Sequence, residues 1–139
     1  MLSNHYVGFA DGACRSTHNL SSATWSLFAL DGDLIDLQAN LLGKITNNIV
    51  EYSAVIEILS EAVSLSIRDL VVKLDSQLVV LQLRRHYSVI NAQILCIYLC
   101  VILLEINFDH ITYQHIPRNL NTLTDALENF VLDRNLHHL

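Results

Sequence analysis

The sequence contains few of the residues that interrupt helices and strands, proline and glycine, and few cysteines that could form disulfides. Its 139 residues include one proline, four glycines and three cysteines. Cys14, Cys96 and Cys100 are too few and too unevenly spaced for a disulfide framework, and no nearby histidine completes a tetrahedral metal site. We therefore interpret these cysteines as core thiols of a protein from a reducing compartment.

Charged residues are also scarce, and basic ones most of all. They make up 16% of the chain, which has eight Lys or Arg residues and a formal net charge of −6. Because contacts to phosphates need Lys or Arg, this balance argues against a protein that holds nucleic acid by bulk electrostatics. The local field matters more than the sum, however, and acidic residues that bind cations would not repel a polyanion.

Long apolar runs are absent, although 52% of the residues are hydrophobic. The longest candidate, Ala92–Leu104, is interrupted by Gln93 and is shorter than the roughly 18 residues of a membrane span, so it predicts a buried helix. Ser3, Asn4 and His5 do not begin a signal peptide. We expect one domain over residues 1–139, located in the cytoplasm without membrane contact, as a monomer or a weak dimer.

Hydrophobic periodicity predicts elements in the order β-β-β-α-β-α-α-β-α. The expected strands are Tyr6–Ala10, Ala23–Leu30, Leu34–Leu42, Asp69–Leu74 and Phe108–Ile116. The expected helices are one that is capped by Asn47 or Asn48 and ends near Ser66, and the segments Ser76–Arg84, Ala92–Ile106 and Thr124–Leu136. An antiparallel start followed by α/β units predicts an α/β fold, with a five-stranded mixed sheet and helices on both faces.

Four carboxylates, Asp11, Glu51, Asp75 and Asp125, stand at the ends of these elements. Each alone has an ordinary explanation: a turn residue for Asp11, a partner of the helix dipole in the first helical turn for Glu51, and a helix cap for the other two. Together they are expected to converge on one point. Hard divalent cations neutralise such a cluster, and two ions about 3.5–4 Å apart are a common arrangement for phosphodiester cleavage.

The motifs around these carboxylates, F-A-D-G-A, T-N-N-I-V-E-Y, L-D-S-Q-L-V and I-P-R with the later D-A-L, resemble the type 1 ribonuclease H family in its compact archaeal and plant-like branch. The resemblance runs from residue 9 to about residue 130. It implies a metal-dependent endonuclease that hydrolyses the RNA strand of RNA–DNA hybrids and leaves 5′ phosphates. It also implies that the four carboxylates are catalytic and bind two Mg²⁺ or Mn²⁺ ions.

The same resemblance implies a substrate-binding set: Lys44, Thr46, Asn47, Asn48, Arg118 and Asn121. The two adjacent asparagines would meet base edges and ribose hydroxyls, whereas Lys44, Thr46 and Asn121 would hold a phosphate of the DNA strand. Arg118 is the cation in a loop where many members of the family place a histidine.

The sequence departs from the family in two regions. Residues 14–22 lack the glycines and prolines usual after the first motif, and residues 84–87 keep little of the basic handle of bacterial members. Two alternatives therefore stay open. One is a catalytically weak or inactive ribonuclease-H-like binding or scaffold domain, for instance of retroelement origin. The other is a nuclease or integrase of the same fold that acts on DNA, which the T-N-N-x-x-E arrangement disfavours.

Overall fold

The computed structural model describes residues 5–15, 20–43 and 45–121, with backbone alone for residues 13–15. In this part of the chain the elements are β1 (His5–Arg15), β2 (Leu20–Ala29), β3 (Leu34–Leu42), α1 (Asn47–Ser64), β4 (Asp69–Leu74), α2 (Gln77–Leu83), α3 (Ala92–Glu105), β5 (His110–His115) and a 3₁₀ turn, η2 (Arg118–Leu120). The predicted order is confirmed through β5. The last expected helix, Thr124–Leu136, lies outside the described residues.

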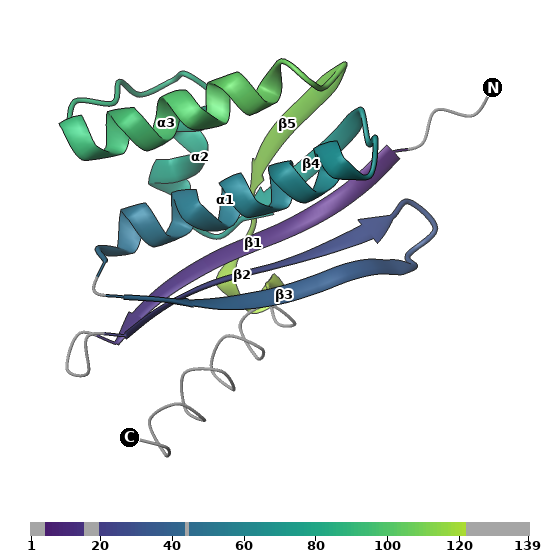
Figure 1. Cartoon of the computed structure of the whole chain (residues 1–139), viewed down its shortest axis with the longest axis horizontal. Helices are drawn as coiled ribbons and strands as arrows, with labels where there is room; N and C mark the ends of the chain where they lie inside the picture. The colour runs from purple at the N-terminus through teal and green to yellow at the C-terminus, as the bar shows by residue number, and fades with distance from the viewer. Residues whose placement is uncertain (1–4, 16–19, 44, 122–139) are drawn as a thin grey trace.

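The five strands form one mixed sheet, as expected, and their order in the sheet is β3-β2-β1-β4-β5 (Figure 1). β2 lies antiparallel to both β1 and β3, whereas β4 lies parallel to both β1 and β5. β1 is therefore the central strand, and β4 brings its carboxyl end to the middle of β1. Parallel strands place the loops that follow them at one edge of the sheet, where α/β proteins usually build their sites.

The first strand is longer than its apolar run predicted. It does not stop at Ala10 but continues through Asp11 and Gly12 to Arg15. The reason is pairing with β2, which matches Asp11 with Thr24 and Gly12 with Ala23 across the antiparallel ladder. Asp11 is thus a mid-strand residue rather than a turn residue.

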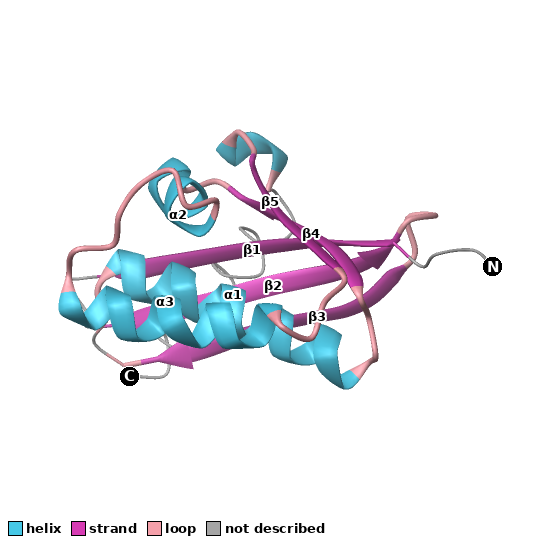
Figure 2. Ribbon diagram, turned by 90° about the horizontal axis from the view of Figure 1, so that it is seen from above, coloured by secondary structure: helices cyan, strands magenta, loops and turns pink. Residues whose placement is uncertain are grey.

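Helix α1 covers β1 and β2 and supplies much of the core (Figure 2). Val50, Ala54, Ile58 and Ala62 recur along one side of the helix, and all four are fully buried. The expected N-cap, Asn47 or Asn48, is wrong: Thr46 is the N-cap, and its side chain makes no capping hydrogen bond. Consequently Glu51 lies in the second turn and not in the first, where the helix dipole would have explained it.

Helix α3 packs on α1 and is far less buried than its composition predicted (Figure 2). Its buried residues are Ile94 and Val101, which lie on one side of the helix. Cys96 and Cys100 are exposed, so their interpretation as core thiols is wrong. The helix lies at the outside of the fold, and packing against α1 buries one face only. In the described part of the chain no helix has the length and apolar character needed to span a membrane.

Candidate active site

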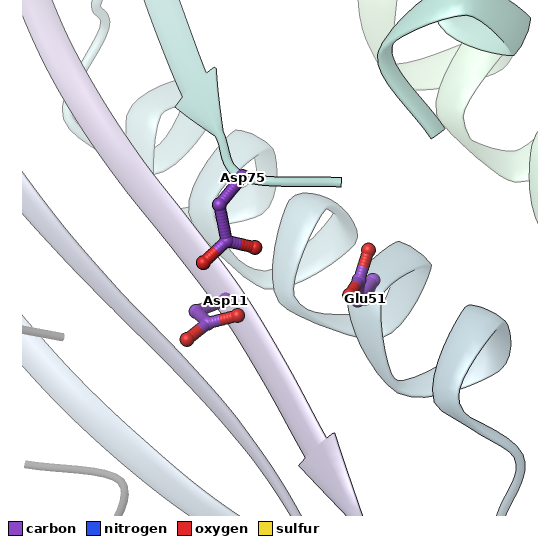
Figure 3. A group of neighbouring side chains, drawn as sticks. All are labelled: Asp11, Glu51 and Asp75. Carbon is purple, nitrogen blue, oxygen red and sulfur yellow. The ribbon is translucent and has the colours of Figure 1, made fainter. Parts of the chain in front are cut away.

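Asp11, Glu51 and Asp75 come together as expected, from three different elements (Figure 3). Asp11 belongs to the central strand, Glu51 to α1, and Asp75 directly follows β4. One carboxylate oxygen from each residue lies within 4.8 Å of the other two. Three acidic groups that are distant in sequence thus form a cluster that could hold a metal ion.

The register of two parallel strands places two of these carboxylates side by side. Ala10 of β1 is paired with Leu74 of β4, so Asp11 and Asp75 each stand one residue beyond the same pair. Asp75 does not cap α2, because Ser76 is the N-cap and its Oγ accepts a hydrogen bond from the Val79 N–H at 3.3 Å. The Asp75 carboxylate is therefore left to point toward β1 (Figure 3).

Gly12 brings the third carboxylate within reach. A Cβ atom on Gly12 would lie 2.7 Å from the Glu51 backbone nitrogen and 2.7 Å from the carbonyl carbon of Val50. Both are backbone atoms that cannot rotate away, so only glycine lets α1 approach β1 this closely. The glycine of the D-G pair is a packing residue here and not a turn residue.

Burial leaves two of the carboxylates with unused oxygen atoms. The Asp11 side chain is 5% exposed, and its Oδ1 accepts a hydrogen bond from the Gly12 N–H at 2.9 Å. Glu51 Oε2 and Asp75 Oδ2 are both buried without a hydrogen-bond partner among the described residues. A buried polar atom without a partner is costly, and its presence at a site indicates a group that binds there.

The electrostatics of the cluster are most evident at Glu51. Burial raises the pKa of Glu51 from 4.5 to about 7. A hydrogen bond with Ser76 lowers this pKa, the nearby Asp75 carboxylate raises it, and the Arg118 guanidinium lowers it. A carboxyl group with a pKa this high is a frequent mark of a functional site.

The donor set fits hard divalent cations. Carboxylate oxygens are the ligands that Mg²⁺ and Mn²⁺ prefer, and Asp11, Glu51 and Asp75 each bring one such oxygen to the cluster. The fourth predicted ligand, Asp125, lies outside the described residues. A cation would relieve both the repulsion among the carboxylates and the desolvation of their buried oxygens.

The expected substrate residues are spread around this cluster. Thr46, Asn47 and Asn48 are exposed where α1 begins, so the helix connects them directly to Glu51. Arg118 is exposed in η2 and is close enough to Glu51 to affect its pKa. Lys44 lies outside the described residues.

Asn121 takes a different position from the other expected phosphate ligands. Its side chain is 2% exposed, and its Nδ2 donates a hydrogen bond to the Ala10 carbonyl at 3.3 Å. This contact ties the segment after η2 to the central strand beside Asp11. Its predicted role toward a DNA-strand phosphate stays a prediction.

Ser76 is a site residue that sequence reasoning did not single out. It both caps α2 and forms a hydrogen bond with Glu51. The signal was present in the L-D-S-Q motif, where a serine directly follows Asp75 at the end of a strand. A serine in that place predicts a helix cap. Its contact with Glu51 could not be predicted, because it depends on the position of α1 in the folded chain.

Comparison with known proteins agrees with this geometry. The model of the family described as "Reverse transcriptase-like" matches residues 9–131. Ribonuclease HI of Halobacterium salinarum is 31% identical over 125 residues, which are 90% of this chain and 63% of that protein. The bifunctional protein Rv2228c of Mycobacterium tuberculosis is 36% identical over 92 residues, which are 66% of this chain and 25% of that protein. The chain thus spans only part of the length of these relatives.

Solved structures match over nearly the whole chain. RNase H1 of Halobacterium salinarum superposes with a TM-score of 0.88 and 30% identity, covering 94% of this chain and 98% of that one. The N-terminal RNase H domain of Rv2228c superposes with a TM-score of 0.90 and 29% identity, covering 98% and 99%. The chain therefore belongs to the reverse transcriptase-like family and has the fold of the type 1 ribonucleases H.

Proposed function

We propose that the chain is a ribonuclease H that hydrolyses the RNA strand of RNA–DNA hybrids with the help of two Mg²⁺ or Mn²⁺ ions. The observation that carries this proposal is the meeting of Asp11, Glu51 and Asp75, with buried oxygens of Glu51 and Asp75 left without partners. Asp125 completes the set as a fourth ligand. When bound, the ions supply activation of the attacking water and stabilisation of charge on the leaving 3′ oxygen.

The chain's own residues position the ions and the strand. Asp11 is held in place by its pairing with Thr24 of β2, one residue beyond the last pair of β1 with β4, and its Oδ1 accepts a hydrogen bond from the Gly12 N–H. Glu51 has a raised pKa, so it gives up a proton when a cation binds. Asp75 directly follows β4 beside Asp11, where its carboxylate would help to hold the cations.

The start of α1 is suited to a nucleic-acid strand. Thr46, Asn47 and Asn48 present neutral hydrogen-bonding groups, which can read ribose hydroxyls and base edges in a hybrid. A cavity of about 300 Å³ adjoins them and is lined by Thr46, Asn48, Ile49, Gln82, Val89, Asn91, Gln93 and Ile94. Lys44, Thr46 and Asn121 remain the proposed contacts to a DNA-strand phosphate, and Arg118 a proposed contact to the substrate.

The names and the folds of similar proteins also support a ribonuclease H function. The Halobacterium salinarum relative is named ribonuclease HI. LC11-RNase H1, which is 23% identical and superposes with a TM-score of 0.87, was crystallised in complex with an RNA/DNA hybrid. At that identity the likeness is one of fold, and it indicates that this fold can accommodate a hybrid.

The deciding experiment is cleavage of an end-labelled RNA–DNA hybrid by the wild-type chain and by Asp75→Asn. An amide neither neutralises nor bridges two cations, so Asp75→Asn is expected to lower the rate by several orders of magnitude in either Mg²⁺ or Mn²⁺. Asp33→Asn is the matched control, because it removes the same charge from an exposed turn between β2 and β3. Equal rates for all three proteins, or activity that persists in EDTA, would refute the proposal.

The alternative of a catalytically weak or inactive binding or scaffold domain is favoured by the reduced basic handle at residues 84–87. The same assay separates the two functions. A wild-type protein that binds the hybrid without cutting it in either metal would support the binding domain. Cleavage of the RNA strand that is lost in Asp75→Asn would support the enzyme.

A further inference from the structure

One side of α3 is apolar and faces solvent. We call this surface the outer face of α3, and it consists of Leu95, Cys96, Leu99, Cys100, Leu103 and Ile106. Leu99 is 51% exposed, Leu103 65% and Ile106 74%. The buried residues Ile94 and Val101 lie on the opposite side of the helix, against α1. A continuous exposed apolar strip of this kind marks an interaction surface more often than a solvated one.

The outer face of α3 carries no charge. Between Arg85 and Glu105 the sequence has no Lys, Arg, Asp or Glu. Glu105 is itself engaged, because Oε1 accepts a hydrogen bond from Arg85 at 2.7 Å and Oε2 accepts one from the Tyr113 hydroxyl at 2.7 Å. A charged partner would find nothing to pair with here, and an anionic lipid surface would find no basic residue to attract it.

The Asn91 side chain caps the first turn of α3 by accepting hydrogen bonds from the Gln93 and Ile94 N–H groups, but the end turns of the helix hold no residue of the charge that would balance the helix dipole. The first turn has no acidic residue, and the last turn has no basic residue. No charged side chain within the end turns of α3 itself therefore balances the partial charges of the helix dipole. An antiparallel helix of the same kind would place its negative end beside the positive end of α3, and its positive end beside the negative end.

These observations fit one partner best. We infer that the outer face of α3 pairs with the same face of a second copy of this chain, around a two-fold axis that sets the two helices antiparallel. A two-fold axis brings each surface against itself, so like charges would oppose one another, and an uncharged apolar strip is self-complementary. Leu99 and Cys100 lie near the middle of α3, close to the expected axis. The inference does not rest on the proposed function.

The association is expected to be weak. A helix of 14 residues is about 21 Å long. One face of it offers a few hundred Å², less than the roughly 800 Å² per partner of a standard stable interface. Two copies that each carry a net charge of −6 also repel one another. Added salt screens this repulsion, so the dimer should become tighter as the ionic strength rises.

The test is sedimentation velocity of the full chain over a range from low micromolar to near-millimolar concentration, at low and high NaCl. The wild type is expected to shift from monomer to dimer with concentration, and more readily at high salt. Leu99→Glu should raise the dimer dissociation constant at least tenfold, because it buries two like charges near the axis. Leu103→Glu serves as a second disrupting variant should the first fold poorly.

Leu30→Glu is the matched control, because Leu30 is 69% exposed outside α3 and gains the same charge. It is expected to dimerise like the wild type. A wild type that stays monomeric throughout, or a dimer that Leu99→Glu and Leu103→Glu leave intact, would overturn the inference. Circular dichroism of each variant confirms that a lost dimer is not a lost fold.

Cross-linking tests the orientation of the pair. The exposed thiols of Cys96 and Cys100 lie on the outer face of α3, so a short bis-maleimide should join two copies. The double variant Cys96→Ser and Cys100→Ser should lose this cross-link while keeping the concentration-dependent dimer. A cross-link that survives in the double variant, or its absence in a wild-type dimer, would argue against antiparallel pairing through this face.

Discussion

At the scale of single residues, Gly12 is as necessary to the site as the carboxylates, because it allows α1 to pack closely on β1. We predict that Gly12→Ala destabilises the fold by about 1–3 kcal/mol, because its Cβ would lie 2.7 Å from the backbone nitrogen of Glu51 and α1 would have to withdraw. Withdrawal moves Glu51 away from Asp11, so hydrolysis should fall more steeply than stability explains. Urea denaturation and hybrid cleavage measure the two effects.

Gly43→Ala is the control for this substitution, since a Cβ there meets no atom within 4 Å. It should leave both stability and cleavage close to those of the wild type. If Gly12→Ala and Gly43→Ala behaved alike, the close approach of α1 to β1 would not be the reason for glycine at position 12.

The raised pKa of Glu51 predicts an unusual pH dependence of the free energy of unfolding in the absence of metal. Its pKa is about 7 in the folded chain against 4.5 ordinarily, so between these values the folded state holds a proton that the unfolded state has lost. The free energy of unfolding should therefore rise as pH falls from 7 toward 4.5, by about 1.4 kcal/mol per unit from this group, and level off below.

The contribution of Glu51 is isolated by comparing the wild type with Glu51→Gln in EDTA. The amide has no proton to take up, so this variant should lack the rise between pH 7 and 4.5. Denaturant titrations at several pH values provide the measurement. Parallel pH profiles for the two proteins would mean that Glu51 titrates normally in the folded chain.

At the scale of elements, α2 is attached to the site through its cap. The Ser76 Oγ accepts a hydrogen bond from the Val79 N–H, and the Ser76 side chain also forms a hydrogen bond with Glu51. Ser76→Ala is predicted to cost about 1 kcal/mol, the usual loss for an N-cap, and to raise the pKa of Glu51 further by removing that contact. Ser76→Thr keeps a hydroxyl and should retain most of both effects.

Two measurements separate the roles of Ser76. Thermal unfolding reports the cap, and the pH profile of hydrolysis reports the contact with Glu51. Ser76→Ala should shift the acidic limb of that profile upward. A variant that loses stability without any shift would show that Ser76 is a cap alone.

At the scale of the whole molecule, the carboxylate cluster links metal binding to folding. Three acidic groups within 4.8 Å of one another repel in the metal-free state, and a cation that binds only the folded chain stabilises it by RT ln(1 + [L]/Kd). The melting temperature should thus rise with Mg²⁺ or Mn²⁺ more than with NaCl of equal ionic strength.

Asp11→Asn tests the repulsion directly. It is predicted to raise the metal-free melting temperature and to abolish most of the response to Mg²⁺ and Mn²⁺, because it removes a buried like charge and a ligand together. Asp33→Asn, in an exposed turn, should change neither. A metal-free Asp11→Asn protein that melts below the wild type would speak against a repelling cluster.

Local patterns of the sequence were sufficient for the elements of the described chain. Alternation predicted β2, and the turn after it predicted β3 as its hairpin partner. The β-branched run predicted β4, and spacings of three and four residues predicted α1. Such patterns report which residues face a common side, and this is a property of neighbouring residues. The motifs around Asp11, Glu51 and Asp75 likewise identified the residues that meet, through resemblance to a family.

The tertiary structure decided what depends on distant partners. Pairing with β2 extended β1 through Asp11, and the passage of α1 over β1 gave Gly12 its role in packing. Exposure of Cys96, Cys100 and Leu103 followed from the outer position of α3, although its uniformly apolar composition predicted burial. Composition reports how apolar a helix is, but only the arrangement of the other elements determines how many of its faces are covered.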